Sequence, residues 1–228
     1  MFAVLINGLA TSGGALLGIL LKKGIPQHLS QALYAVMGLG LLVVAIQGAI
    51  QTENPLLLLV SGAVGAGTGT ALRIEDRLQA AGVWLQQRLR ADGGSQFAEA
   101  FVSLSIMQIV GAMAILGPLQ AALLGDSTLL YLKSTVDGVS AFIFGAIYGA
   151  GAVPVGLAVV LYEAAMYLLA SLIAPLMTPD VVRELGAVGN VMILAIALNM
   201  LGLTKLKVAD YLPAVIIPVI YYHIVVLL

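Results

Sequence analysis

The sequence alternates between apolar runs of about twenty residues and short segments that contain charges, proline or glycine. A run of roughly 20 apolar residues is what an α-helix needs to cross the hydrocarbon core of a bilayer. Asn54 and Asp210 each stand directly before a run, as helix N-cap residues do, and Pro55 occupies a first helical position. The pattern predicts an all-α membrane protein with eight spans, at Phe2–Leu21, Gln31–Ile50, Pro55–Leu72, Phe97–Leu124, Thr128–Gly149, Val153–Leu176, Leu185–Leu203 and Tyr211–Leu227.

One segment, residues 73–96, resembles the sequence of a soluble protein. Its apolar residues recur at helical spacing, and charged residues occupy the opposite side. This pattern is typical of a helix on the cytoplasmic surface of a membrane, and a docking face for a partner is the alternative. The apolar residues are Ile74, Leu78, Ala81, Leu85 and Leu89, the charged ones are Glu75, Arg77 and Arg88, and Trp84 is available at the interface.

The composition agrees with a membrane protein. Of the 228 residues, 61% are hydrophobic and 9% are charged, and the mean hydropathy is +1.08. A soluble domain carries about 25% charged residues. The lipid bilayer is therefore the first expected partner.

Several classes of function are excluded or left without support. The absence of cysteine excludes disulfides and thiolate chemistry, and two distant histidines do not suggest a metal site. The formal net charge of −1, without a basic tract, gives no reason to expect a nucleic acid partner. Sequence motifs of hydrolases, metalloproteases and nucleotide-binding enzymes are missing. We therefore expect no enzymatic activity, no catalytic residue and no cofactor.

Basic residues gather on one side of the membrane when eight spans are drawn. Loops on that side carry eight Lys and Arg residues, and loops on the other side carry one, Arg183. Because loops rich in Lys and Arg stay in the cytoplasm, both termini are predicted to lie outside it. Without a crossing by the fifth run this asymmetry would be lost. The eight residues are Lys22, Lys23, Arg73, Arg77, Arg88, Arg90, Lys205 and Lys207.

The first three spans resemble the last three. Residues 33–47 align without gaps on residues 185–199, and a small loop gap places Asn7 opposite Glu163 and Asn54 opposite Asp210. The two halves would cross in opposite directions, which is the inverted repeat common in secondary transporters. We expect one transmembrane domain, 1–228, with a first repeat (about 1–72), the amphipathic loop (73–96), central spans (97–150) and a second repeat (about 152–228).

The fifth run contains two charged residues, Lys133 and Asp137. On a helix they share one face with roughly 5–6 Å between Cβ atoms, so they can pair. Either ion alone in hydrocarbon costs at least about 2.5–3.5 kcal/mol, so such residues usually face a bundle interior, a hydrated cavity or each other. The alternative is that the run starts near the headgroups, where Lys133 snorkels and Asp137 is only its partner.

Glu163 lies near the middle of the sixth run, with no basic residue close to it in sequence. It must be neutral, hydrated or paired in space, with Lys133 as the obvious partner. Each outcome suggests a proton or ion site, and a structural ion pair explains both residues equally simply. The predicted substrate- or ion-binding residues, with no metal ligand among them, are Lys133, Ser134, Asp137, Glu163, Asn7, Gln108, Asn190 and Asn199.

Glycines recur in several runs at the spacing of Gly14 and Gly18. Small residues at this spacing let helices approach closely, within the chain or between copies in a homo-oligomer. The fourth run is longer than one span requires, and Gly117-Pro118 interrupts it. Since proline removes a helical hydrogen bond, a kink or break is expected there.

Short stretches over nearly the whole chain carry a family resemblance. They are Asn7, Leu20-Leu21-Lys22-Lys23-Gly24-Ile25, Leu72-Arg73-Ile74-Glu75, Gly111-Ala112-Met113-Ala114-Ile115-Leu116-Gly117, Lys133-Ser134, Asp137-Gly138 and Leu212-Pro213-Ala214. Together they resemble the uncharacterised bacterial YqgA/YdfK family (domain of unknown function family 554) of polytopic inner-membrane proteins. The resemblance implies a multi-pass protein of the bacterial inner membrane and no particular activity. The chain departs from the family pattern at Met107-Gln108-Ile109-Val110 and at Glu163, where glutamine is expected.

These observations favour a transporter or channel for a small solute or ion, with a polar site at the bundle centre. In that reading Lys133 binds or counters an anionic group, and Asp137 holds it or accepts a proton. The alternative is a non-transporting assembly or regulatory component that works through packed helices. A transporter needs the polar residues to converge, whereas a scaffold would use them as scattered pairs that join helices.

Reporter fusions test the predicted topology. Fusions after Lys23, Arg90 and Lys207 should report the cytoplasm, because these loops carry the basic residues. Fusions after Glu53 and Asp180 should report the outside. If Arg90 and Lys207 lie on opposite sides, both the span count and the inverted repeat are wrong.

Overall fold

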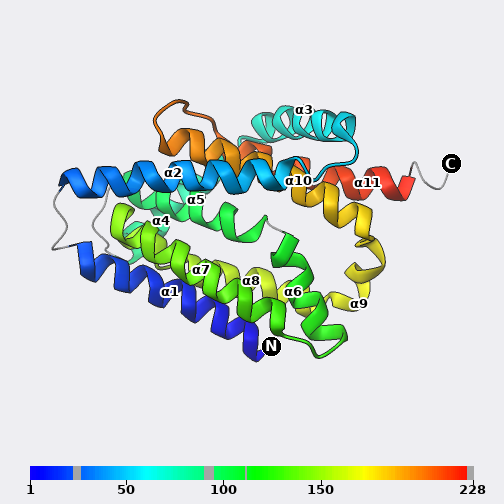
Figure 1. Cartoon of the computed structure of the whole chain (residues 1–228), viewed down its shortest axis with the longest axis horizontal. Helices are drawn as coiled ribbons and strands as arrows, with labels where there is room; N and C mark the ends of the chain where they lie inside the picture. The colour runs from blue at the N-terminus through cyan, green and yellow to red at the C-terminus, as the bar shows by residue number, and fades with distance from the viewer. Residues whose placement is uncertain (23–26, 90–94, 111, 225–228) are drawn as a thin grey trace. The chain divides into compact units, whose positions relative to one another are not determined.

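A computed structural model describes residues 1–22, 27–89, 95–110 and 112–224. Within these ranges the chain forms helices and no strand (Figure 1). In chain order they are α1 (Phe2–Lys22), α2 (Gln27–Ala49), α3 (Pro55–Leu72), α4 (Ile74–Leu89), α5 (Ser95–Ile109), α6 (Ala112–Leu123), α7 (Thr128–Tyr148), η1 (Ala150–Ala152), α8 (Val155–Leu168), α9 (Ala170–Ile173), η2 (Ala174–Leu176), α10 (Pro179–Met200), η3 (Val208–Ile216) and α11 (Ile217–Ile224).

Five described helical segments are long and apolar enough to cross a membrane. A sixth span results if the bent pair of α5 and α6 counts as one. Gly38–Ala49 in α2 and Val208–Ile224 are shorter apolar stretches. The chain is therefore a helical membrane protein, and the count of eight spans stays a prediction. The five segments are Phe2–Leu21, Pro55–Leu72, Thr128–Tyr148, Ala150–Leu168 and Pro179–Met200.

The N-cap predicted at Asn54, before α3, is confirmed, and the N-cap predicted at Asp210 is wrong. The Asn54 Oδ1 accepts the Leu57 N–H at 3.0 Å, and Pro55 occupies the first turn of α3. Asp210 instead lies inside η3, and its Oδ1 accepts the Glu75 N–H at 2.8 Å. Asp210 therefore caps the start of α4, which a sequence pattern of local residues cannot show.

The break in the fourth predicted span occurs before Gly117-Pro118. Gln96–Ile109 and Met113–Leu123 are bent by 54° relative to each other, whereas α6 continues through Pro118. A Cβ atom on Gly117 would lie 3.0 Å from the Leu130 side chain of α7. The expectation of a break at Gly117-Pro118 was therefore wrong, since α6 is continuous there, and a kink within α6 stays a prediction.

Residues 74–89 of the amphipathic segment form α4, with one detail different from the prediction, and residues 90–94 of the segment lie outside the described ranges. Trp84 is 63% exposed, and Leu78 and Leu85 are half-buried. Glu75, expected on the polar side, is half-buried, and its Oε2 accepts the Ala209 N–H at 2.8 Å. The partner of this carboxylate comes from a distant part of the sequence. Attachment of α4 to a membrane surface stays a prediction.

Contacts divide the chain into two compact units, each assembled from distant segments. Unit 1 consists of Met1–Ala32, Leu78–Ile109 and Met113–Ser171. Unit 2 consists of Leu33–Arg77, Val110–Ala112 and Leu172–Leu228. Unit 1 therefore contains α1, α5, α7 and α8, and unit 2 contains α3, α10, η3 and α11. The predicted division into two repeats, which runs along the sequence, stays a prediction.

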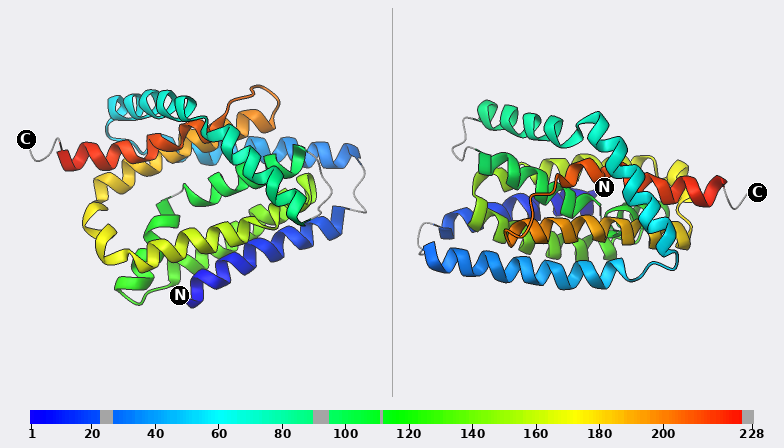
Figure 2. Two further views of the ribbon diagram at one scale, coloured as in Figure 1. Left: turned by 180° about the vertical axis from the view of Figure 1, so that it is seen from behind. Right: turned by 90° about the horizontal axis from the view of Figure 1, so that it is seen from above.

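In unit 1, α1 runs beside α7 and also packs against α8 (Figures 1 and 2). A Cβ atom on Gly14 of α1 would collide with the Gly138 carbonyl oxygen of α7. A Cβ atom on Gly145 of α7 would likewise collide with the backbone of Ala15. The glycines thus let two backbones touch, in agreement with the packing interpretation of their spacing.

In unit 2, α3 packs against η3. The part of α2 that belongs to this unit packs against α10. Cβ atoms on Gly65 and Gly69 of α3 would collide with Ala214 and with the backbone of Asp210. A Cβ atom on Gly48 of α2 would collide with the side chain of Asn190 on α10. Close approach through glycine is therefore common to both units.

A pair of neighbouring substitutions tests the contact of α1 with α7. Gly14→Ala should lower the free energy of unfolding by about 1–3 kcal/mol, because the new methyl group meets the Gly138 backbone. Gly13→Ala is the matched control, since nothing lies within 4 Å of a Cβ atom there and alanine favours a helix. Thermal unfolding in detergent measures both variants. Equal melting temperatures would contradict the contact.

Candidate functional site

Four polar side chains form a buried cluster in unit 1. Lys133 and Asp137 lie one turn apart on α7, Glu163 lies on α8, and Asn7 lies on α1. Lys133 is 4% exposed, and Glu163 and Asn7 are fully buried. The alternative of a snorkelling lysine requires Lys133 to extend to the surface of the unit. Its burial shows that it does not. We name these four residues the charged cluster.

The ammonium group of Lys133 lies between two carboxylates. Its Nζ atom pairs with the Asp137 Oδ2 and lies 3.2 Å from the Glu163 Oε1. The Asn7 Nδ2 joins the same two acceptors, donating to the Asp137 Oδ2 at 3.1 Å and to the Glu163 Oε1 at 2.6 Å. Three helices thus meet through one ammonium and one amide. The predicted pairing of Lys133 with Asp137, and with Glu163, is confirmed.

Two acceptor atoms in the charged cluster have no hydrogen-bond partner. They are the amide oxygen of Asn7, Oδ1, and the second carboxylate oxygen of Glu163, Oε2. Both side chains are fully buried. Over the described ranges, Ser61 Oγ and Ser105 Oγ are the other buried side-chain atoms in this condition. A buried acceptor without a partner costs about 1–3 kcal/mol. The Asn7 Oδ1 and the Glu163 Oε2 can each therefore accept a further hydrogen bond.

The charged cluster also has unequal numbers of charges. If all three ionisable groups are charged, one ammonium faces two carboxylates, which leaves a formal charge of −1. A buried net charge is costly unless it is compensated. Among the described residues, no group of three His, Cys, Asp or Glu could hold a metal ion.

Gln108 of α5 connects to the charged cluster through the backbone of Asp137. Its Nε2 donates to the Asp137 carbonyl oxygen at 3.0 Å, and its Oε1 accepts from the Thr11 hydroxyl at 3.2 Å. Thr11 was absent from the predicted set. It lies one turn after Asn7 on the same face of α1, and this spacing was the available signal.

The remaining predicted residues make local hydrogen bonds. The Ser134 hydroxyl donates to the Leu130 carbonyl oxygen at 2.7 Å, within α7 and next to the charged cluster in sequence. The Asn190 Nδ2 donates to the Gly186 carbonyl oxygen at 2.8 Å, within α10 of unit 2. The Asn199 Oδ1 accepts the Leu206 N–H at 2.8 Å and so closes the turn after α10. The structure brings Asn7, Gln108, Lys133, Asp137 and Glu163 together, and Asn190 and Asn199 belong to unit 2.

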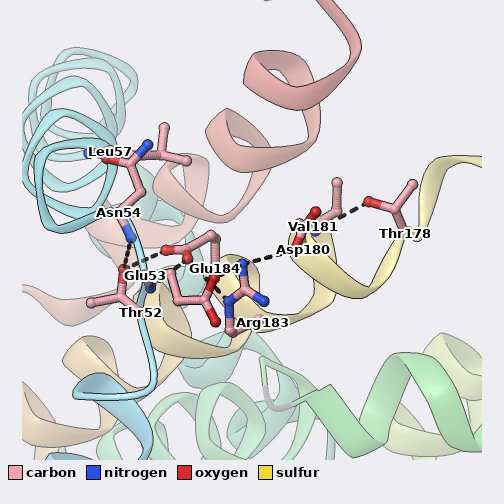
Figure 3. Close-up of polar contacts among 9 residues, drawn as sticks. All are labelled: Thr52, Glu53, Asn54, Leu57, Thr178, Asp180, Val181, Arg183 and Glu184. Atoms are coloured by element: carbon pink, nitrogen blue, oxygen red, sulfur yellow. Dashed lines mark hydrogen bonds and ion pairs between the residues drawn. The ribbon is translucent and has the colours of Figure 1, made fainter. Parts of the chain in front are cut away.

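A second polar network lies in unit 2, around Glu184 (Figure 3). Glu184 is 1% exposed and accepts the Glu53 N–H at 2.9 Å and the Thr52 hydroxyl. Arg183 pairs with Asp180 at 2.8 Å and with Glu53 at 3.1 Å. Both oxygens of Glu184 have partners, unlike those of Glu163. This network fixes the loop before α3 to α10, and its buried glutamate was not predicted because it follows an exposed, charged loop.

One exposed pair has pKa values that are shifted by its own contact. The Lys207 Nζ lies 2.8 Å from the Asp76 Oδ1. This hydrogen bond lowers the pKa of Asp76 and raises the pKa of Lys207. Both groups are solvated, so the pair adds little stability and offers no enclosed binding site.

The fold and the charged cluster define the class of this protein, a helical membrane protein with ionisable groups buried between its helices. The chain belongs to the family described as Protein of unknown function (DUF554), which matches residues 2–223. This confirms the resemblance seen in the sequence.

Two relatives match almost end to end. Uncharacterized membrane protein YdfK of Bacillus subtilis (strain 168) is 27% identical over 229 residues, which cover 99% of this chain and 97% of YdfK. Uncharacterized protein YqgA of Escherichia coli (strain K12) is 24% identical over 216 residues, or 93% of this chain and 92% of YqgA. No solved structure matches the chain.

Proposed function

We propose that this protein is an inner-membrane transporter or channel for a small solute or ion. The observation that carries the proposal is the charged cluster, in which one ammonium and two carboxylates are buried between helices long enough to cross a membrane. Lys133, Asp137 and Glu163 contact the solute or ion, and Asn7 and Gln108 orient them.

The energetics of the charged cluster favour a transport role over a purely structural one. A buried ion pair is often no more stabilising than well-packed apolar residues of the same volume. Helix packing in this chain is already provided by glycines, as at Gly14 and Gly145. Intramembrane ionisable residues commonly mark substrate, ion or proton pathways. The two acceptors without partners support the same conclusion, because each can accept one further hydrogen bond from a proton donor in the site.

The contacts also support the proposed inverted repeat. The alignment of the halves relates α1 to α8, α2 to α10, and α3 to η3 with α11. Each of these pairs is in contact within one unit. The Asn7 to Glu163 hydrogen bond joins the two positions that the repeat makes equivalent. Midplane sites between repeats are typical of secondary transporters.

We propose the full topology on the same basis. The five long apolar segments, the bent α5–α6 pair and the shorter apolar stretches of α2 and of Val208–Ile224 together give eight crossings. The basic loops then lie in the cytoplasm and both termini lie outside it.

Substitutions in the charged cluster test the transport proposal. Lys133→Met, Asp137→Asn and the double variant should all lose flux in proteoliposomes, because each removes a charge from the site. Lys133→Met should also lower the free energy of unfolding by about 3–5 kcal/mol, because it leaves two carboxylates without their cation. Asp137→Asn and the double variant should unfold closer to the wild type. Flux is measured with radiolabelled sodium, rubidium and chloride and with an entrapped pH dye.

A control on the same helix separates loss of function from loss of fold. Thr135→Val replaces an exposed hydroxyl that bonds only the Tyr131 carbonyl oxygen, so it should keep both stability and flux. If the double variant transports at the wild-type rate, the pair is structural and does not belong to the site. Absence of flux of every probe through the wild-type protein would favour the non-transporting alternative.

A further inference from the structure

We infer that Glu163 carries an exchangeable proton, which its Oε2 donates to the Asn7 Oδ1. The inference rests on the proposed function and deepens it, because it names the proton as the ion that the site carries. The proton would be bound in the packed state described here and released when the site opens.

Hydrogen-bond accounting at Glu163 and Asn7 leads to this assignment. The Glu163 Oε1 already accepts from the Asn7 Nδ2 and from Lys133, while its Oε2 accepts from nothing. The Asn7 Nδ2 donates to the carboxylates, whereas the Asn7 Oδ1 accepts no hydrogen bond. A carboxylate only accepts, whereas a carboxylic acid has one O–H donor. One proton on the Glu163 Oε2 therefore supplies a donor for the Asn7 Oδ1, so that both atoms have a hydrogen-bond partner.

The net charge of the charged cluster also favours a proton on Glu163. A proton on Glu163 leaves Lys133 and Asp137 as a neutral ion pair and brings the cluster to zero net charge. Asp137 is the less suitable carrier, since Lys133 makes its hydrogen bond with the Asp137 Oδ2 and lies 3.2 Å from Glu163, and since only Glu163 has a buried carboxylate oxygen without a partner among the described residues. Hydrogen bonds to the charged form favour that form. The ammonium thus keeps Asp137 ionised, and the proton belongs to Glu163.

The surroundings of Glu163 offer no other compensating group among the described residues. Lys133 and Asp137 of α7 are the charged groups that act on it, and α1 contributes the amide of Asn7. The titratable residue of α5, Glu99, has its hydrogen bond with Tyr148. Tyr162, the neighbour of Glu163 on α8, is a neutral phenol and brings no positive charge.

The number of free oxygens fits a proton better than a metal cation. Hard cations such as calcium take about six to eight oxygen ligands. The charged cluster leaves two acceptors free, which is what one shared proton requires. Loss of that proton would create a buried charge and two unpaired acceptors at once, so the packed state should open to water as the proton leaves.

Glu163→Gln is the sharpest variant. Its amide has the shape of the protonated acid, with a carbonyl to accept from Asn7 Nδ2 and an N–H to donate to the Asn7 Oδ1. It should fold with a melting temperature at least equal to that of the wild type, yet lose proton flux to the level of empty liposomes. Glu163→Ala, which can make neither bond, should lower the melting temperature.

Infrared difference spectroscopy observes the proton directly. Wild-type protein in liposomes at neutral pH should show the C=O stretch of a protonated carboxylic acid, sensitive to deuterium exchange. Glu163→Gln should abolish this band, and Asp137→Asn should abolish it too, because Glu163 is then the one carboxylate left beside Lys133 and is kept ionised by it. No acid band in the wild type, or a band that persists in Glu163→Gln, would overturn the assignment.

Two further outcomes separate this inference from the proposed function. If sodium raises the wild-type melting temperature with dose, Glu163→Gln removes the effect and no acid band is seen, the site binds a metal cation and the proton assignment is wrong. Wild-type flux that persists unchanged in Glu163→Gln would likewise overturn the assignment while transport stands. An acid band in a wild-type protein that moves no probe would refute transport and uphold the proton on Glu163.

Discussion

The position of the Lys133 ammonium between two carboxylates is the interaction on which unit 1 depends. It joins α7 to α8, and the Asn7 amide brings α1 to the same two acceptors. None of these groups reaches solvent, so each must find its partner within the unit. The three helices are therefore fixed not only by apolar packing but by a requirement that no charge is left alone. A change of one proton alters that balance.

Glycine and charge act together in this arrangement. Asn7, Thr11, Gly14 and Gly18 follow one another at three- and four-residue spacing on the side of α1 that meets α7. The glycines remove side chains at the crossing, and the close backbones allow a short amide to reach two carboxylates on neighbouring helices. The Glu184 network of unit 2 offers a contrast, because there both carboxylate oxygens are satisfied by loop residues. In the Glu184 network both carboxylate oxygens have partners and the network stabilises a loop. In the charged cluster one carboxylate oxygen has no partner and can bind a proton.

Helix geometry and the cost of isolated charge made much of the site predictable from sequence. The spacing of Lys133 and Asp137 fixes a shared face, and an isolated Glu163 in hydrocarbon must be neutral, hydrated or paired, with Lys133 as the obvious partner. Asn190 and Asn199 could not be separated from Asn7, since an amide in an apolar run looks the same whether it bonds another helix or its own backbone. The partner of Asp210 comes from a distant segment of the chain, which local patterns do not contain.

Access of water to the charged cluster is the most direct test of the central claim that it lies on a transport pathway. The chain has no cysteine, so Ser134→Cys places a single thiol beside Lys133, at a position that is 5% exposed in the packed state. A charged, membrane-impermeant methanethiosulfonate reagent should modify this thiol in native vesicles, because a working site must open to water. Ala100→Cys, fully buried on α5, should stay protected until the protein is denatured. Equal protection of both thiols at every pH and ion concentration would contradict the account.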